Sequence, residues 1–340
     1  MKKGRKLRVA FIGCGGISGV HAGPLSQDKR VEITKLADTS PKMLKRFKER
    51  FPALAGLPEY GDYRDVLDDV DAVTIQTPHT LHYPQIMAAL DAGCHVLCEK
   101  PLVCKTAHAR KVIAKVRQTG LKLQVAYQRR TDPAYNYIRD QIRSGGIGKL
   151  GFLSVVLCQE WKHLTKGSWR QDPALSGGGQ VNDSGSHIVD MLLWMANQKP
   201  VCVTAFSDNR GTRVDIDTAI SVQFDKGALA SISVIGNARR WDERWFISGS
   251  EAMLLIDNGF KRIDGYGSAP KDMVVPKKSF KPVSINWVDA IYGKARLMSP
   301  PSGVLNVVRL TEAIWKSAAS GGKPVRIPRA WRPPPHNCRG

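Results

Sequence analysis

A glycine-rich segment near the N-terminus has the residue types that can hold a dinucleotide. The run Gly13-Cys14-Gly15-Gly16-Ile17-Ser18 follows an apolar stretch and precedes a helical pattern. Gly13 permits a tight turn, Gly15 lets the backbone approach a pyrophosphate, and Ser18 stands where a small third residue is usual. Backbone amides and the dipole of the following helix would stabilise the phosphate charge. The turn therefore predicts a cofactor site made by Gly13, Cys14, Gly15, Gly16 and Ile17.

Asp38 is the second candidate cofactor ligand. It ends the next apolar stretch, where a carboxylate can accept hydrogen bonds from the hydroxyls of the adenosine ribose. Its charge would repel a 2′-phosphate, so the sequence favours NAD over NADP. Thr39, Ser40 and Lys42 lie nearby and could still bind that phosphate, which keeps NADP as an alternative. Asp at such a position is also common as a turn or helix-capping residue.

Strand and helix patterns alternate through residues 1–126 and would place these groups at one edge of a sheet. Short apolar strands are predicted at 7–12, 32–37, 71–77, 95–98 and 121–126. Helical patterns lie between them at 15–28, 41–50, 80–92 and 105–119. This alternation predicts an α/β domain with a doubly wound parallel sheet, a Rossmann domain that binds NAD. Ligands bind at the carboxyl ends of the strands in such a sheet.

The pattern changes over residues 127–340. A helix is expected at 133–143, and strands are expected at 151–159, 201–207, 219–224, 228–235, 244–248 and 252–256, with a hairpin turn at 225–227. One helix at 186–196 interrupts these strands, and an amphipathic helix follows at 302–319. We predict an α+β domain with a mainly antiparallel open sheet, used for substrate binding and oligomerisation. Its last helix could pack back on the first domain. The open sheet needs covering, so a homodimer or homotetramer is expected.

Several motifs occur in the order typical of one enzyme family. They are Thr77-Pro78-His79-Thr80-Leu81-His82, Ala88-Ala89-Leu90-Asp91-Ala92-Gly93, His95-Val96-Leu97-Cys98-Glu99-Lys100-Pro101, Ser168-Trp169-Arg170-Gln171-Asp172-Pro173, Gly177-Gly178-Gly179 and Asp183-Ser184-Gly185-Ser186-His187-Ile188-Val189-Asp190. From Arg8 to about Ile327 the chain resembles the Gfo/Idh/MocA oxidoreductases, which include inositol dehydrogenases and glucose–fructose oxidoreductase. Two departures are His79, where the family more often has Asn, and Ser18, where it has Ala or Gly.

The resemblance implies that Lys100, Asp183 and His187 surround the reacting carbon. The chemistry agrees, because oxidising a secondary alcohol needs a base for the hydroxyl proton while hydride leaves the carbon. His187 suits that role near neutral pH. Asp183 lies four residues earlier and can share a helix face with it, to orient the substrate or tune the imidazole. The ammonium of Lys100 would donate to the substrate oxygen.

Further residues are expected around the same cleft. The resemblance implies that Trp169 and Arg170 approach both cofactor and substrate, and that Glu99 neighbours the nicotinamide ribose. The remaining expected cofactor contacts are Thr77, Pro78, His79, His82, Lys100 and Gln128, and the expected substrate contacts add Tyr127 and Arg130. Structural alternatives exist for the central three residues: a surface lysine, a helix-capping aspartate and a buried, hydrogen-bonded histidine.

Three functions follow from these residues. The first is an NAD-dependent dehydrogenase acting on a secondary alcohol of a sugar, cyclic polyol or glycoside. The second is a redox-neutral enzyme that oxidises a glycoside transiently, cleaves it by elimination and regenerates NAD, as some relatives of the family do. The third is an NAD-binding regulator, against which the joint presence of Lys100, Asp183 and His187 argues.

Composition narrows the partners and the compartment. Lys plus Arg number 51 against 30 Asp plus Glu, a net charge of +21 that attracts anions. The basic residues are spread along the whole chain with no nucleic-acid-binding motif, so a small-molecule substrate is favoured over nucleic acid. Seven cysteines without CxxC spacing favour a reducing cytoplasm and no metal site. No apolar run approaches the roughly 20 residues that span a bilayer.

Overall fold

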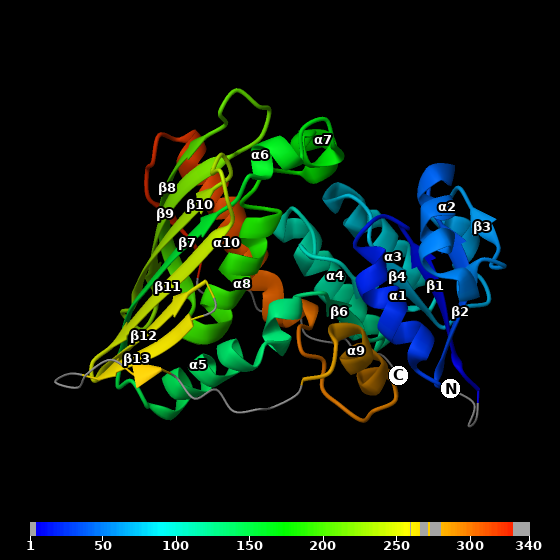
Figure 1. The fold of residues 1–340 in the computed structure, drawn as a ribbon, viewed down its shortest axis with the longest axis horizontal. Helices are drawn as coiled ribbons and strands as arrows, with labels where there is room; N and C mark the ends of the chain where they lie inside the picture. The colour runs from blue at the N-terminus through cyan, green and yellow to red at the C-terminus, as the bar shows by residue number, and fades with distance from the viewer. Residues whose placement is uncertain (1–4, 259, 266–270, 273–279, 329–340) are drawn as a thin grey trace.

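The computed structural model describes residues 5–258, 260–265, 271–272 and 280–328, and contains two sheets (Figure 1). The N-terminal sheet has six parallel strands in the order β3-β2-β1-β4-β5-β6. Their bounds are β1 Leu7–Ile12, β2 Val31–Ala37, β3 Glu59–Tyr60, β4 Ala72–Ile75, β5 His95–Cys98 and β6 Leu123–Val125. The predicted doubly wound parallel sheet is confirmed.

Four α-helices connect these strands. They are α1 Ser18–Gln27, α2 Pro41–Arg50, α3 His82–Asp91 and α4 Thr106–Thr119. Pro41 stands at the first position of α2, and Gly120 ends α4 with a left-handed backbone, as the sequence signals indicate. Helix α1 begins at Ser18 and not at residue 15, because the glycines form the turn itself. The two-residue strand β3 was not predicted, since it is too short to carry a pattern.

The C-terminal sheet has nine strands in the order β14-β13-β12-β11-β7-β10-β9-β8-β15. Their bounds are β7 Leu150–Cys158, β8 Pro200–Asp208, β9 Asp217–Phe224, β10 Leu229–Ile235, β11 Asp242–Gly249, β12 Ala252–Asp257, β13 Phe260–Gly265, β14 Lys271–Asp272 and β15 Val325–Arg326. Only the β7–β10 pair is parallel among the described strands of this sheet. The predicted, mainly antiparallel sheet is therefore confirmed, while β13 to β15 were not predicted.

Helices α8 and α10 pack on one face of this sheet (Figure 1). The α-helices of the C-terminal half are α5 Pro133–Ser144, α6 Trp161–Leu164, α7 Pro173–Ser176, α8 Ser184–Ala196, α9 Val283–Ile291 and α10 Pro301–Ala319. The long helix α10 packs on β8 and α8, and also on α4 and β6 of the N-terminal half. Helix α9 was not predicted, and it packs on α1 and β5. The division of the chain at residue 126 stays a prediction.

The opposite face of the large sheet has no helix of the described chain on it. Alternation along the strands places Leu153 and Trp245 in the core and their neighbours Phe152 and Phe246 on the outer face, partly exposed. Phe206 and Leu229 are exposed as well. The sheet therefore presents large apolar side chains to its surroundings. Among the described helices, none is long and apolar enough to cross a membrane.

The three consecutive glycines 177–179 are required by close packing. A Cβ atom on Gly178 would lie 2.1 Å from the indole of Trp315 on α10. One on Gly179 would lie 1.9 Å from the carbonyl oxygen of Asp215. The Asp215 carboxylate accepts the amides of Gly179 and Val181 at 2.8 and 2.9 Å and the indole N–H of Trp315 at 3.0 Å. This clamp fixes the chain three and five residues before α8 begins.

Adding one methyl group in this clamp is expected to destabilise the protein. Gly179→Ala should lower the free energy of unfolding by about 2 kcal/mol or more, because backbone atoms of residue 215 cannot move aside as a side chain can. Urea denaturation followed by circular dichroism measures the change. Gly56→Ala is the matched control, since its φ is not positive and its Cβ would meet no atom within 4 Å. It should change the free energy of unfolding by no more than about 0.5 kcal/mol. Equal effects of the two substitutions would contradict the packing argument.

Candidate active site

The glycine-rich turn lies at the carboxyl end of β1, beside the end of β4. Gly13 has φ +93°, and a Cβ there would lie 2.8 Å from the backbone carbonyl of Gln76, so only glycine fits. In contrast, a Cβ on Gly15 or Gly16 would meet nothing within 4 Å, and Ile17 is exposed. The surface of the turn is therefore open at the start of α1. Strand order reverses between β1 and β4, which is where a dinucleotide binds in such sheets.

Asp38 faces this turn from the end of β2. Its Oδ2 accepts the amide of Cys14 at 2.8 Å, and its Oδ1 accepts the amide of Ser40 at 2.8 Å. An ionised carboxylate offers about four lone-pair sites, so two remain for ribose hydroxyls. Asp38 thus fixes the turn and remains able to bind a ribose, which joins the two interpretations that the sequence left open.

Arg50 is a neighbour of the turn that sequence reasoning did not identify. Its Nη1 donates to the carbonyl oxygen of Gly16 at 3.1 Å. A Cβ on Gly19 would lie 2.3 Å from its guanidinium, so Gly19 leaves the room in which that group lies. A cation at the end of α2 is thereby held beside the start of α1. No signal in the sequence links positions 19 and 50, which are brought together only by the packing of two helices.

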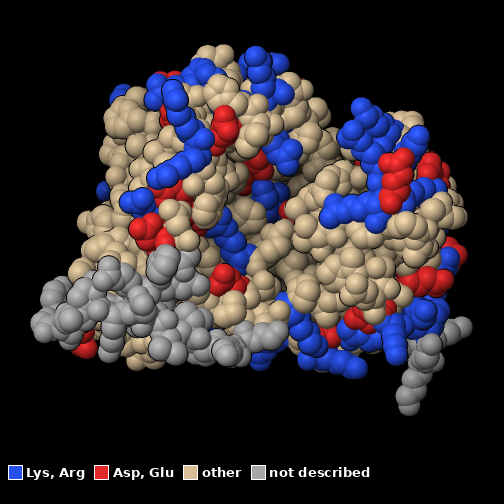
Figure 2. Space-filling view, viewed as in Figure 1, with Lys and Arg blue, Asp and Glu red and all other residues tan. Residues whose placement is uncertain are grey.

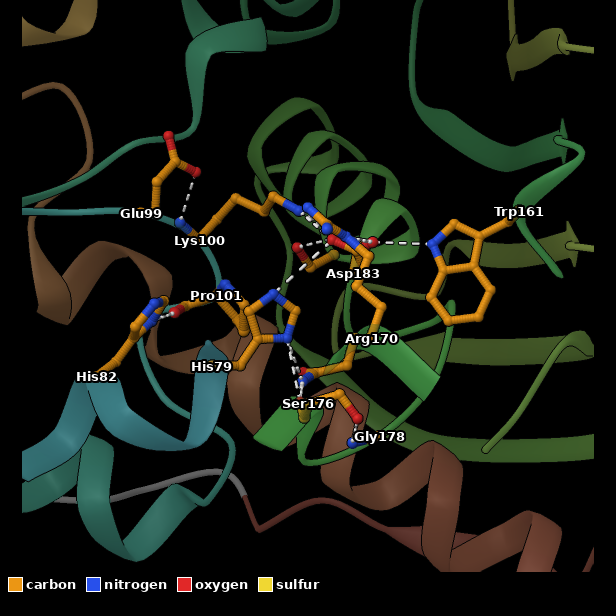
Figure 3. A network of polar contacts seen from close by, with 12 residues as sticks. His79, His82, Glu99, Lys100, Pro101, Trp161, Arg170, Ser176, Gly178 and Asp183 are labelled. Carbon is orange, nitrogen blue, oxygen red and sulfur yellow. Dashed lines mark hydrogen bonds and ion pairs between the residues drawn. The ribbon is translucent and has the colours of Figure 1, made fainter. Parts of the chain in front are cut away.

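Lys100 and Asp183 form the centre of the site (Figure 3). Lys100 follows β5, and its Nζ donates to Oδ1 of Asp183 at 2.7 Å and to the carbonyl oxygen of Asp183 at 3.1 Å. Asp183 precedes α8, but its carboxylate does not cap that helix. Both side chains are largely buried. The ion pair therefore joins the N-terminal sheet to the C-terminal half of the molecule.

Asp183 has further partners on its second oxygen. Oδ2 accepts the indole N–H of Trp161 at 2.8 Å and Nε of Arg170 at 3.0 Å. Burial alone would raise the pKa of Asp183, but the charges of Lys100 and Arg170 outweigh it and hold the pKa below its usual value. The carboxylate is therefore ionised. Trp161 was not predicted, and its only sequence signal is an aromatic residue just after the strand 151–159.

His187 lies one helical turn after Asp183, on α8. Burial lowers its pKa well below the usual 6.5, and the nearby positive charges of Lys100 and Arg129 lower it further. Its Nδ1 has no hydrogen-bond partner among the described residues. The ring of Tyr127 packs edge-on against it, with 5.8 Å between ring centroids. The histidine is therefore neutral and carries a ring nitrogen with unused hydrogen-bonding capacity.

Glu99 lies between the turn and Lys100. Its Oε2 accepts the backbone amide of Lys100 at 3.1 Å, and its Oε1 accepts the side chain of Gln128 at 3.3 Å. Oε1 also lies 2.8 Å from Nε2 of His21, a buried residue of α1 that sequence reasoning did not identify. The carboxylate is thus held from three sides at the edge of the sheet where the cofactor was predicted.

Two histidines of the first motif, His79 and His82, lie buried near the ion pair. The ring of His82 is buried between the carbonyl oxygens of Pro101, 2.7 Å from Nδ1, and Thr77, 3.0 Å from Nε2. Nε2 of His79 lies 3.8 Å from Asp183, and its ring contacts Trp169 edge-on. Burial lowers the pKa of both imidazoles. Complete burial of His82 does not fit direct contact with a cofactor, whereas Thr77 and Pro78 are partly exposed.

Arg130 does not fit the substrate contact that we expected. Its guanidinium is buried and donates to both oxygens of Asp190, Nε at 2.9 Å and Nη2 at 2.5 Å. Nη1 donates to the carbonyl oxygen of Met298 at 2.9 Å. The sequence placed it near the cleft because it follows β6, but the paired Asp190 lies on α8 and is distant in the chain. Arg130 therefore ties α8 to the segment that follows β6 and to the loop before α10.

The comparisons with known proteins agree with this geometry. Residues 7–127 match the model of the Gfo/Idh/MocA oxidoreductase family, NAD-binding Rossmann fold, and residues 135–255 match the Gfo/Idh/MocA C-terminal domain. The fold and site thus define an NAD-binding oxidoreductase of two parts. The chain belongs to the Gfo/Idh/MocA family, as its motifs predicted.

Individual relatives are distant in sequence and close in fold. The uncharacterized oxidoreductase YrbE of Bacillus subtilis (strain 168) is 28% identical over 274 residues, covering 75% of this chain and 74% of that protein. Inositol 2-dehydrogenase of Rhizobium meliloti (strain 1021) is 27% identical over 277 residues, covering 74% and 76%. Levoglucosan dehydrogenase, solved with NADH and levoglucosan, has a TM-score of 0.83 at 22% identity and covers 96% of this chain and 100% of that chain. That last likeness shows the fold alone.

Removing Arg130 is expected to affect stability more than substrate affinity. Arg130→Ala leaves the carboxylate of Asp190 buried without its partner, which typically costs about 3–5 kcal/mol. Urea denaturation measures the loss. Arg64→Ala is the control, because Arg64 forms an exposed ion pair with Asp62 and its removal should leave the transition unchanged. A raised KM in Arg130→Ala with unchanged stability would restore the substrate-binding role.

Proposed function

We propose that this protein is an NAD-dependent dehydrogenase that transfers hydride to or from a secondary hydroxyl carbon of a sugar, cyclic polyol or glycoside. The observation that carries the proposal is the buried Lys100–Asp183 ion pair one helical turn before a neutral histidine, His187. Relatives in sequence named inositol 2-dehydrogenase and levoglucosan dehydrogenase support this class of substrate.

The residues of the turn fit NAD, which would supply the hydride acceptor. The open surface over Gly15 and Gly16 leaves room for the pyrophosphate, and the free lone pairs of Asp38 favour ribose hydroxyls over a 2′-phosphate. Glu99, which binds the backbone amide of Lys100 and the side chain of Gln128, would contact the nicotinamide end of the cofactor together with Gln128. Lys42, exposed on α2, keeps NADP as the alternative cofactor.

The proton released from the substrate hydroxyl is taken up by His187. In oxidation, the neutral imidazole of His187 takes the proton of the substrate hydroxyl, and in reduction it returns it. Lys100 donates a hydrogen bond to the same oxygen and stabilises its developing negative charge. Asp183 keeps Lys100 in place and its charge paired, while Trp169 and Arg170 line the substrate side. Nδ1 of His187 is buried without a partner among the described residues, so this scheme assigns Nε2 to the substrate hydroxyl.

The outer face of the large sheet would be covered by a second copy of the chain. Phe152, Phe206, Leu229 and Phe246 are large apolar side chains exposed on that face. On the face drawn in Figure 2, Lys and Arg are scattered over both halves of the molecule, which gives no continuous stripe for a nucleic acid. A cytoplasmic location stays a prediction from the cysteine content.

A cofactor-reduction screen tests the proposal. Purified protein is incubated with NAD, and separately NADP, against inositols, aldoses, uronates and simple glycosides, and the absorbance of reduced nicotinamide is followed. We expect turnover with one class. Lys100→Ala and His187→Ala should each lower kcat/KM by about 100-fold or more, the usual effect of removing an acid–base or oxyanion-stabilising group.

Other outcomes separate the alternatives. A glycoside consumed without net reduction of NAD would indicate the redox-neutral cleaving enzyme. If no substrate is oxidised or cleaved and the protein binds DNA in a salt-sensitive manner, it would be the NAD-binding regulator. Full activity in both variants would exclude Lys100 and His187 from the chemistry.

The pH profile of oxidation should reflect the lowered pKa of His187. Because the neutral form is the base, activity falls only as pH drops through its pKa. An ordinary histidine of pKa 6.5 would lose roughly fourfold in kcat/KM by pH 6.0. We expect kcat/KM with saturating NAD to stay constant from pH 7.5 to 6.0 and to fall only below that range. A fall centred near pH 6.5 would contradict the role assigned to the buried imidazole.

A further inference from the structure

A cavity of about 280 Å³ lies beside Asp183 and is also lined by Trp161, whose indole N–H binds that carboxylate. This size is close to the lower end of ligand pockets, roughly 300 Å³. Its lining includes Trp161, Leu164, Arg170, Asp183, Arg240 and Trp241. Figure 3 shows Lys100 and Trp161 approaching Asp183 from opposite sides, so the carboxylate stands between the ammonium and this cavity.

The cavity has an apolar mouth that takes no part in the proposed hydride transfer. Leu164 is 79% exposed and Trp241 is 53% exposed, although both are large apolar side chains. They come from α6 and from the segment just before β11, two elements far apart in the chain. Deeper in the cavity, the indole N–H of Trp161 is bonded to Asp183, which fixes that ring in place. Two indoles and a leucine therefore border a space that begins at the catalytic carboxylate.

We propose that this cavity is a second subsite that binds a group attached to the reacting ring, so that the substrate is a glycoside and not a free sugar or polyol. The inference rests on the proposed function. With the reacting hydroxyl at Lys100, a single ring is placed at Asp183, and a substituent on that ring extends to Trp241 and Leu164. Indole faces bind flat groups with apolar faces, and burying the exposed mouth would add to affinity.

Two kinds of substituent share this chemistry. An aryl group stacks on indole directly, and a second pyranose ring presents its C–H face. Arg240, whose side chain is 79% exposed and pairs with Asp242 only at 4.0 Å, could donate hydrogen bonds to hydroxyls at the rim. The cavity walls fit both, and the substrates used in the test distinguish them.

Matched methyl, phenyl and glucosyl β-glycosides of each hexose in the screen test the subsite. Steady-state kinetics with NAD give KM for each, and calorimetric titration of the NADH-loaded protein gives Kd without needing turnover. We expect the phenyl or the glucosyl compound to bind about tenfold more tightly than the methyl compound. Trp241→Ala and Leu164→Ala should each reduce that ratio towards one. Preference for phenyl identifies an aryl group, and preference for glucosyl identifies a second sugar ring.

Val20→Ala is the control, because Val20 is an exposed apolar residue, 45% exposed, that lies on α1 and does not line the cavity. It should keep the full ratio. Equal affinities for the three glycosides, or a ratio unchanged in Trp241→Ala, would overturn the subsite while leaving the dehydrogenase intact. Preferential binding of the phenyl or glucosyl compound without hydride transfer would uphold the subsite and count against the dehydrogenase.

Discussion

The buried ion pair between Lys100 and Asp183 is the constraint on which the rest of the site depends. Two charges removed from water are costly unless each is fully paired, and here one residue comes from the end of β5 and the other from the start of α8. The second oxygen of Asp183 is satisfied by Trp161 and Arg170, so no lone charge remains. The pair can form only if the two halves of the chain are held in register, and most of the unusual packing nearby serves that purpose.

The packing of α10 against both α4 and β8 provides this register. Within the C-terminal half, Arg130 binds Asp190 on α8 and Asp215 binds the backbone just before α8, which fixes the start of that helix. The glycines at 178 and 179 are the points where Trp315 and residue 215 approach the chain too closely for any side chain. A motif of three glycines that resembles a flexible loop in the sequence is therefore a tightly packed junction.

The spacing of apolar residues predicted the longer strands and helices, because an element that buries a face against the core repeats apolar residues at its own structural period. It failed for β3, β14 and β15, of two residues each, and for β13 and α9, and the contacts of α9 with α1 depend on the tertiary fold. For the site, the family motifs brought Lys100, Asp183 and Glu99 to one place. Trp161, Arg50 and His21 were missed, since each acquires its partner only across a packing interface. Arg130 was misplaced for the same reason, because its position after β6 was visible but Asp190 was not recognised as its partner.

The charges around His187 determine the protonation state of its imidazole. A positive Lys100 nearby disfavours an imidazolium, so the histidine is held neutral until a substrate hydroxyl arrives. In the proposed oxidation, the proton of the hydroxyl moves onto the imidazole beside the ammonium of Lys100, and the carboxylate of Asp183 offsets the added charge. The ionised carboxylate of Asp183 thus has two roles in the proposed mechanism. It holds Lys100 in place, and its negative charge stabilises the imidazolium that forms when His187 takes the proton. The low pKa of Asp183 follows from the first role and is required by the second.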